Sequence, residues 1–291
     1  MRRHCTRESQ ISRFSSPSTR ILLREGVLEA VGPIIVGVVN VTPDSFSDGG
    51  MFTDPDVAID YGVRLVEQGA HIVDVGGEST RPGAATVGTA EELRRVLPVV
   101  AGLASRGVTV SIDTRHAEVA RAALGNGAAI VNDVSGLRDP VMRDVLAEHG
   151  VPVVIMHTPV DDPATMQRYA QYDDVVQSVV GFLRDRIAFA AAGGVTQVIV
   201  DPGIGFGKTT DHNLEILRRL DEVVALGLPV LVGASRKRFV GEITGVEAPG
   251  ARLAGTLVAH LAALDHGASM LRVHDVAAHV EAVRMWQALH A

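Results

Sequence analysis

The chain has 291 residues, a length that suits a single (β/α)8 barrel and is long for one β-sandwich. It is 46% hydrophobic and only 4% aromatic, so its core must be built from Val, Ala, Leu and Ile. A formal net charge of −7, with no basic stripe, argues against a nucleic-acid partner. No apolar run reaches the ~18 residues of a membrane span, and the lone Cys5 allows neither a disulfide framework nor a cysteine metal cluster. We therefore expect a soluble, cytoplasmic protein.

The N-terminal tail, residues 1–19, is rich in Arg and Ser, with Glu8 as its only acid. A transit peptide has this composition, but the tail shows no clear amphipathic period, so we predict that it is disordered. Residues 20–291 contain no linker or low-complexity segment and are predicted to form one domain. Its first element is predicted to be a small hairpin over residues 21–30 that closes the bottom of the fold.

Eight short runs rich in Val, Ile and Ala follow the hairpin, and helix-length stretches separate most of them. The runs are Ile34–Asn40, Ile72–Gly76, Val108–Asp113, Ala128–Asn132, Val151–His157, Val198–Asp201, Pro229–Ser235 and Ser269–His274. This alternation is typical of a parallel sheet with crossover helices, and eight such units close a (β/α)8, or TIM, barrel. We therefore predict an α/β fold with its active site at the C-terminal ends of the strands.

Helix starts and long loops are also marked in the sequence. Asp54 before a proline predicts a capped helix start, and Thr89 with Glu92 three residues later predicts another. The loops over residues 41–54 and 76–89 exceed the usual two to six residues of a strand-to-helix connection. Loops this long at a catalytic face are predicted to act as lids.

Polar residues stand at or just past the C-terminal ends of the runs, where core packing does not require them. They are Asn40, Glu78, Asp113, Asn132, His157, Asp201, Lys237, Arg272 and His274. Asp113, Asn132 and Asp201 would converge in a barrel mouth and suit a heterocycle with several N–H donors. Asp201 could alternatively cap its own loop. The glycines after Asp201 fit neither a P-loop, because position 202 is Pro, nor a Rossmann fingerprint.

A second group comes from the first and last runs, which become neighbours when a barrel closes. It contains Asn40, Arg272 and His274. An arginine, a histidine and an amide oxygen can hold an anion and a hard metal ion, such as pyrophosphate with Mg2+. Arg272 could instead pair with Asp275 or another surface acid.

The chain has 25 Arg and only two Lys, and both lysines stand in loops after predicted strands. Arginine cannot replace a compact ammonium where space is tight, so both positions are candidates. Lys237 follows Ser235 and Arg236 in a segment that favours a bound carboxylate or phosphate, although a basic run could also be a solvated surface. Lys208 is expected at the outer end of its loop, where it would matter less. His157 could contact a ligand or be a structural histidine.

Taken in order, eight segments resemble the motifs of the dihydropteroate synthase family. They are GVVNVTPDSFSDGG (37–50), GGESTRPGA (76–84), SIDT (111–114), VNDVSG (131–136), IMH (155–157), DPGIGFGK (201–208), GASRKRF (233–239) and RVHD (272–275). Because all eight stand at predicted strand ends in the right order, the resemblance is far more specific than any single motif.

The resemblance implies a folate-pathway transferase that joins p-aminobenzoate to 6-hydroxymethyl-7,8-dihydropterin pyrophosphate, with Mg2+ as cofactor. The pterin would be bound by Asp113, Asn132, Asp201 and Lys237, and Met156 is also expected to bind a substrate. The pyrophosphate would be gripped by Asn40, which would also ligate Mg2+, together with Arg272 and His274. The p-aminobenzoate pocket, which sulfonamides also occupy, would be bordered by Phe46, Thr80, Arg81, Pro82, Phe206 and Ser235. The residues expected to take part in catalysis are Asp113, Lys237, Arg272 and His274.

The implied reaction is SN1-like. An aromatic amine is a free nucleophile at neutral pH, so no Ser or Cys nucleophile is needed. Asp113 would stabilise positive charge on the pterin, while Mg2+, Arg272 and His274 would stabilise the departing anion. Two alternatives stay open: a non-catalytic paralogue that binds pterin, and a methyltetrahydrofolate-binding methyltransferase domain, which has no need of these anion-binding groups. The expected partners are small-molecule substrates and a second copy of the chain, without nucleic acid or membrane.

Overall fold

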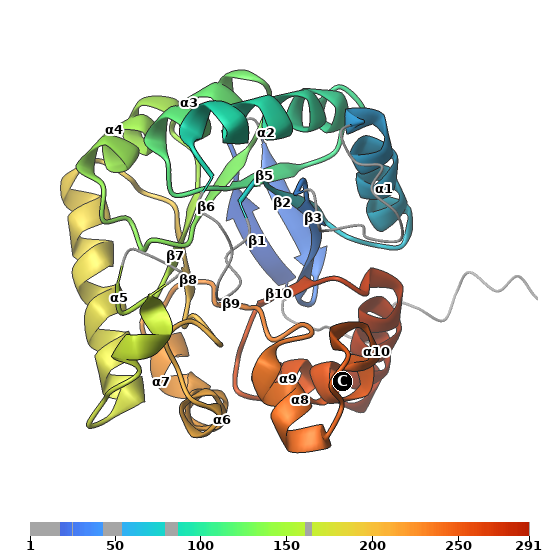
Figure 1. Cartoon of the computed structure of the whole chain (residues 1–291), viewed down its shortest axis with the longest axis vertical. Helices are drawn as coiled ribbons and strands as arrows, with labels where there is room; N and C mark the ends of the chain where they lie inside the picture. The colour runs from blue at the N-terminus through green and yellow to red at the C-terminus, as the bar shows by residue number, and fades with distance from the viewer. Residues whose placement is uncertain (1–17, 25, 43–53, 79–86, 161–164, 291) are drawn as a thin grey trace, which may run out of the picture.

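Eight parallel strands form a barrel with helices around it, as the alternation of apolar runs predicts (Figure 1). The computed structural model describes residues 18–24, 26–42, 54–78, 87–160 and 165–290. The barrel strands are β3 (Ile34–Asn40), β4 (Ile72–Gly76), β5 (Val110–Asp113), β6 (Ile130–Asp133), β7 (Val153–Met156), β8 (Val198–Asp201), β9 (Leu231–Val232) and β10 (Met270–Val273). Their order is β8-β7-β6-β5-β4-β3-β10-β9, and a parallel bridge between Val200 and Val230 joins the two ends of the sheet.

The observed strands coincide with the predicted runs to within a few residues, except for β9. Only two residues of the run Pro229–Ser235 are strand. The Ala234 N–H donates to Nε2 of His260 at 2.9 Å instead of to a neighbouring strand. The chain therefore leaves the barrel wall early at this point, and the residues after β9 form a loop held by a helix.

Ten α-helices cover the described part of the barrel. They are α1 (Pro55–Glu67), α2 (Thr89–Ala104), α3 (Ala117–Gly125), α4 (Pro140–His149), α5 (Val175–Ala192), α6 (Thr210–Arg218), α7 (Leu220–Val224), α8 (Arg238–Thr244), α9 (Leu253–Asp265) and α10 (Val276–Leu289). Short 3-10 helices also occur at η1 (Met166–Tyr169) and η2 (Pro249–Ala251). None of the helices in the described ranges is long and apolar enough to cross a membrane.

One predicted helix cap is confirmed and the other is wrong. The Asp54 side chain accepts a hydrogen bond from the Asp56 N–H at 3.0 Å and caps α1. Thr89 is the first residue of α2 and Gly88 is its N-cap, with no side-chain bond to the backbone. The Glu92 carboxylate cannot reach back to complete a capping box, because it is buried and bonds Nδ1 of His116 at 2.6 Å.

Apolar side chains pack in two separate layers. The larger cluster lies between the strands and the helices and contains residues such as Val73, Leu103 and Leu183. The smaller cluster fills the inside of the barrel near the N-terminal ends of the strands, with Ile34 and Met270 among its members. Because apolar atoms fill this end of the barrel, polar side chains gather at the opposite, C-terminal end.

A hairpin of β1 (Ser18–Leu22) and β2 (Val27–Val31) closes the bottom of the barrel, as predicted. Ile21 and Ala30 belong to the inner cluster, so the hairpin seals it. The hairpin begins at Ser18, so the last two residues of the predicted tail belong to it. Residues 1–17, on which the prediction of disorder mainly rests, lie outside the described residues.

The hairpin gives a direct stability test. Ile21→Ala should lower the free energy of unfolding by about 2–5 kcal/mol, because it leaves a cavity in the inner core. Leu22→Ala is the matched control, since this neighbouring residue is 48% exposed and should change the stability by about 0.5 kcal/mol or less. Urea unfolding followed by circular dichroism measures both. Equal losses would mean that the hairpin does not seal the barrel.

Candidate active site

A cavity of about 390 Å³ opens at the C-terminal ends of the strands, where the site was predicted. Every described residue that the family resemblance assigns to the site lines it, whereas the candidate His157 does not. The lining residues are Asn40, Asp113, Asn132, Met156, Asp201, Phe206, Ser235, Lys237, Arg272 and His274. The other predicted residues, Phe46, Thr80, Arg81 and Pro82, lie outside the described residues, as do most of the two long loops that carry them. Glu78 also lines the cavity and pairs with Arg115 at 3.0 Å.

The sheet register brings the predicted acids and amides together. Asp113 lies opposite Asn132 on the neighbouring strand, and Asp201 lies opposite Met156. The side chains of Asn40 and Asp113 flank Gly76, since Oδ1 of Asn40 and Oδ2 of Asp113 lie 3.7 and 3.6 Å from the point where a Cβ of residue 76 would stand. The strand ends therefore present a continuous row of carboxylate and amide oxygens to the cavity.

Arg272 lies inside this row of acids. Its Nε contacts Oδ2 of Asp74 and its Nη2 contacts Oδ2 of Asp113, both at 2.7 Å. The alternative that Arg272 pairs with Asp275 is wrong, because Arg236 occupies that carboxylate with two hydrogen bonds of 3.0 and 2.6 Å. The guanidinium expected beside the pyrophosphate is thus held, in this structure, by Asp74 and by Asp113, the acid expected to bind the pterin.

Asp74 was missed by the sequence analysis. It is 1% exposed and lies in the middle of β4, where an apolar run hides it. One feature of the sequence could have indicated it: among the acids in the eight predicted runs, only Asp74 lies within a run and not at its end. Strand alternation alone could not reveal that it points into the barrel, because the register was unknown.

Asp201 both lines the cavity and caps its loop, so the position of a site residue and the role of a loop cap do not exclude each other here. Its Oδ1 accepts a hydrogen bond from the Gly203 N–H at 2.7 Å. Lys237 reaches the same loop, where its ammonium donates to the Ile204 carbonyl and lies 4.5 Å from the centre of the Phe206 ring. Gly205, at φ +84°, allows this approach, since a Cβ there would stand 2.9 Å from Cδ of Lys237.

Lys208 does not lie at the outer end of its loop, so that expectation was wrong. It is 2% exposed, and its ammonium lies 2.9 Å from Nδ1 of His157 and 3.0 Å from the Phe206 carbonyl. Burial lowers the pKa of His157 to about 2, with the Lys208 charge acting in the same direction. His157 is therefore neutral, and its Nδ1 accepts the bond from the ammonium. This buried pair fits the structural reading of His157.

The loop after β9 carries Ser235 and is fixed from behind. Oγ of Ser235 lies 3.2 Å from the His274 N–H, which donates to it, and 3.0 Å from Nδ1 of His274. The Arg236 N–H donates to Oγ1 of Thr256 at 3.1 Å, and this bond supports a left-handed backbone at Arg236, with φ +60°. The Ser235 hydroxyl thus reaches the cavity on a loop that is fixed by α9 and by His274, the residue that follows β10.

Burial and nearby charges set the ionisation of the site. Burial raises the pKa of Asp113 to about 7, and Arg272 opposes this rise. Burial also raises the pKa of Asp201, against the effect of Lys237. The pKa of Lys237 falls to about 8, chiefly because the ammonium is buried. The pair Asp113 and Lys237 can therefore change charge close to neutral pH.

Comparisons with known proteins agree with this geometry. The family model described as pterin binding enzyme matches residues 36–274. The dihydropteroate synthase of Mycobacterium leprae is 49% identical over 266 residues, which are 88% of this chain and 94% of that protein. Two solved structures are similar to this chain over nearly its whole length. That of the Thermus thermophilus dihydropteroate synthase with 4-aminobenzoate has 49% identity and a TM-score of 0.86, covering 93% of this chain and all of that one.

The second is the Xanthomonas albilineans dihydropteroate synthase in complex with 7,8-dihydropteroate. It has 45% identity and a TM-score of 0.85, with 94% of this chain and 99% of that one covered. The residues matched by the family model extend from before Asn40 to His274 and so include all the described site residues. The chain belongs to the dihydropteroate synthase family of pterin binding enzymes.

Proposed function

We propose that the protein condenses 6-hydroxymethyl-7,8-dihydropterin pyrophosphate with p-aminobenzoate to give 7,8-dihydropteroate and pyrophosphate. The observation that carries this proposal is the convergence of Asp113, Asn132, Asp201 and Lys237 in one cavity at the barrel mouth. The product of this reaction is the ligand named for the X. albilineans structure, which shares the fold. Family membership and site geometry thus lead to the same reaction.

The pterin end of the cavity is chemically matched to the ring. A pterin presents several N–H donors along one edge, and the carboxylates of Asp113 and Asp201 are acceptors. Lys237 supplies a donor beside Phe206. Hydrogen bonds to charged groups are worth roughly 1.5–3 kcal/mol each, so this set can fix both the position and the orientation of the ring.

The residues at the pyrophosphate end fit a site for Mg2+ that is completed by the substrate. In the described ranges, no three His, Cys, Asp or Glu side chains are placed to hold a metal. Mg2+ commonly uses few protein oxygens, with substrate phosphates and water filling the remaining positions, and Oδ1 of Asn40 is such an oxygen. When bound, Mg2+ would neutralise charge on the leaving pyrophosphate. His274 would add a hydrogen bond to the same anion.

The reaction then proceeds by cleavage of the bond between the pterin methylene carbon and the pyrophosphate oxygen. The electron pair leaves with pyrophosphate, and positive charge spreads from the methylene carbon into the ring. Ionised Asp113 stabilises that charge. The p-aminobenzoate nitrogen, near Ser235 and Phe206, donates its lone pair to the methylene carbon and loses a proton to solvent. No enzyme nucleophile takes part.

Three further features belong to the same proposal. Sulfonamides would compete with p-aminobenzoate for its pocket. The protein would act in the cytoplasm, in keeping with its composition. It would also form a homodimer, for which exposed apolar side chains on α9 and α10, such as Val258 and Met285, offer contact area.

The comparisons give no support to the alternative of a methyltransferase domain. An activity assay distinguishes the enzyme from the other alternative, a non-catalytic paralogue that binds pterin.

The first test is turnover. Purified protein with Mg2+, the pterin pyrophosphate and p-aminobenzoate should release pyrophosphate and form dihydropteroate only when both substrates are present. A sulfonamide should raise the Michaelis constant for p-aminobenzoate without changing the limiting rate. Folded protein that binds the pterin but makes no product would leave the paralogue as the better description.

The second test compares the two lysines. Lys237→Arg should lower kcat/KM at least tenfold, about 1.4 kcal/mol of transition-state stabilisation, with little change in Tm, because a wide guanidinium cannot take the place of the ammonium beside Phe206. Lys208→Arg should instead lower Tm by a few degrees, because overpacking a buried site costs about 1–3 kcal/mol. If Lys237→Arg behaved as wild type while Lys208→Arg lost turnover at unchanged Tm, the roles would be reversed.

The third test is the pH profile of kcat/KM for the pterin substrate. Asp113 accepts N–H bonds as a carboxylate, so activity should rise as pH increases through about 7. Lys237 donates as an ammonium, so activity should fall as pH increases through about 8. Lys237→Arg should remove the alkaline limb and keep the acid limb. An alkaline limb that persists in this variant would assign it to another group.

A further inference from the structure

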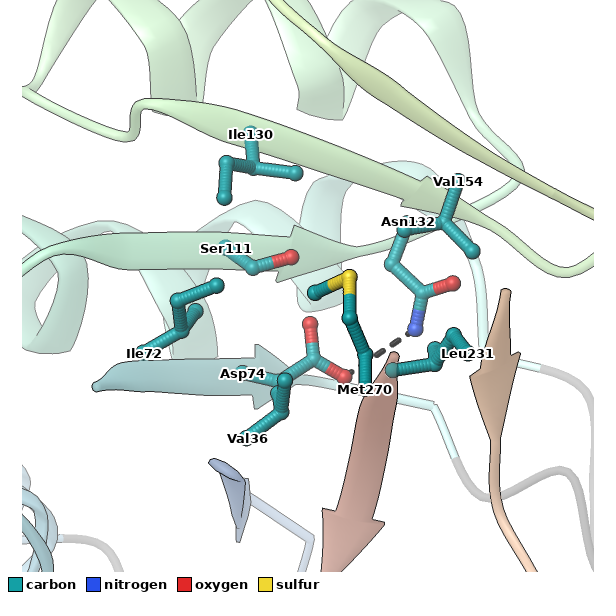
Figure 2. Close-up of a pocket in the computed structure, with 9 residues that line it drawn as sticks. All are labelled: Val36, Ile72, Asp74, Ser111, Ile130, Asn132, Val154, Leu231 and Met270. Carbon is teal, nitrogen blue, oxygen red and sulfur yellow. Dashed lines mark hydrogen bonds between the residues drawn. The ribbon is translucent and has the colours of Figure 1, made fainter. Parts of the chain in front are cut away.

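Asp74 lies one layer below the substrate cavity. It is absent from the lining of the large cavity and instead borders a small space inside the barrel, together with Asn132 and Ser111 (Figure 2). Its Oδ2 accepts two hydrogen bonds, from Nδ2 of Asn132 at 3.0 Å and from Nε of Arg272 at 2.7 Å. One buried oxygen thus contacts two of the residues that line the cavity above it.

The bond to Asp74 determines which way the Asn132 amide faces. Because Nδ2 donates downward to the carboxylate, a flipped amide would place two oxygens against each other. Oδ1 of Asn132 is therefore kept free of the carboxylate and available as an acceptor. The amide oxygen can then accept a hydrogen bond from a pterin N–H group without a free-energy cost for turning the side chain.

Arg272 is oriented in the same way. Its guanidinium is gripped from two sides, by Asp74 through Nε and by Asp113 through Nη2. Two bonds to different atoms of a planar group fix its plane as well as its position. Without Asp74, the guanidinium would retain one anchor and could rotate about it.

The other oxygen of Asp74, Oδ1, has no hydrogen-bond partner among the described residues. It adjoins the small space of about 10 Å³, and Asp74 lies directly opposite Ser111 on β5. Figure 2 shows the carboxylate pointing toward the Ser111 side chain. The space is large enough for one water molecule, which would bond both side chains, and its remaining walls are apolar. They are formed by Val36, Ile72, Ile130, Val154, Leu231 and Met270.

We propose that Asp74 is a positioning residue for pterin binding, which acts through Asn132 and Arg272 and is solvated from below by one buried water shared with Ser111. The inference rests on the proposed function, because it takes the pterin as the ligand of the cavity. Asp74 itself does not line the cavity that would hold the substrate. Its effect should fall on the pterin substrate and not on the p-aminobenzoate pocket, since among the described residues its hydrogen bonds reach only Asn132 and Arg272.

The test uses three variants of the full chain. Asp74→Ala removes the acceptor. Asp74→Asn is the conservative variant, because its carbonyl oxygen can take the place of Oδ2 and turn the NH2 group toward Ser111. Ser111→Ala is the matched control in the same buried layer, with no hydrogen bond to Asn132 or Arg272. For each we would measure Tm, the Kd of 6-hydroxymethyl-7,8-dihydropterin by calorimetry, and the KM of p-aminobenzoate.

Asp74→Ala should weaken pterin binding at least tenfold and leave the KM of p-aminobenzoate within about twofold. Asp74→Asn should recover most of the lost affinity. Ser111→Ala should lower Tm without changing the Kd. In an Asn132→Ala background, the further loss caused by Asp74→Ala should be smaller than in wild type, because one of its two targets is gone.

Unchanged pterin affinity in Asp74→Ala would overturn the proposal, and so would an equal loss at both substrate sites, which indicates general damage. Should the alanine variant not fold, Asp74→Leu fills the same space without an acceptor and is judged by the same measurements. Failure of the proposed function looks different: the wild type itself would bind no pterin or form no dihydropteroate.

Discussion

Mutual neutralisation of buried charges is the constraint on which this site depends. Three carboxylates and three cations lie at or just below the described part of the barrel mouth. The acids are Asp74, Asp113 and Asp201, and the bases are Lys208, Lys237 and Arg272. Burial raises the pKa of Asp113 and Asp201 and lowers the pKa of Lys208 and Lys237, and the opposite charges nearby counter these shifts. An unpaired charge at this depth would cost several kcal/mol, so none of the six could be kept there alone. Their balance lets the protein hold strong hydrogen-bonding groups ready in a site that is largely removed from water.

The barrel supplies the geometry that this balance needs. Parallel strands end at one rim, so residues that are remote in sequence, such as Asp113 and Arg272, meet without any special loop. Glycines then allow the loops to close on the side chains. Gly203, at φ +68°, is the clearest case, since a Cβ there would stand 2.0 Å from the His157 carbonyl. The apolar inner core and its hairpin hold the opposite end of the barrel closed.

Much of this arrangement could be predicted from the sequence, for a physical reason. The C-terminal ends of parallel strands share a rim, so polar residues that end apolar runs converge whatever the exact strand bounds. Asn132 and Asp201 were predicted in this way. Asp74 was not, because the inward direction of a residue within a strand depends on register. The position of Lys208 was predicted wrongly because the length of a loop does not reveal whether it folds back into the barrel. The capping box of Thr89 and Glu92 was predicted wrongly because the Glu92 carboxylate bonds His116 instead.

According to the proposed function, buried Asp113 would have to ionise in order to hold the pterin ring. Calorimetry of 6-hydroxymethyl-7,8-dihydropterin binding at about pH 6.5, in two buffers with different ionisation enthalpies, measures this directly. This ligand lacks the titrating pyrophosphate. Because burial raises the pKa of Asp113 to about 7, part of the free protein carries the proton there at this pH, and binding should release it. Asp113→Asn should abolish the release. Binding with no proton release, or with proton uptake, would contradict the account.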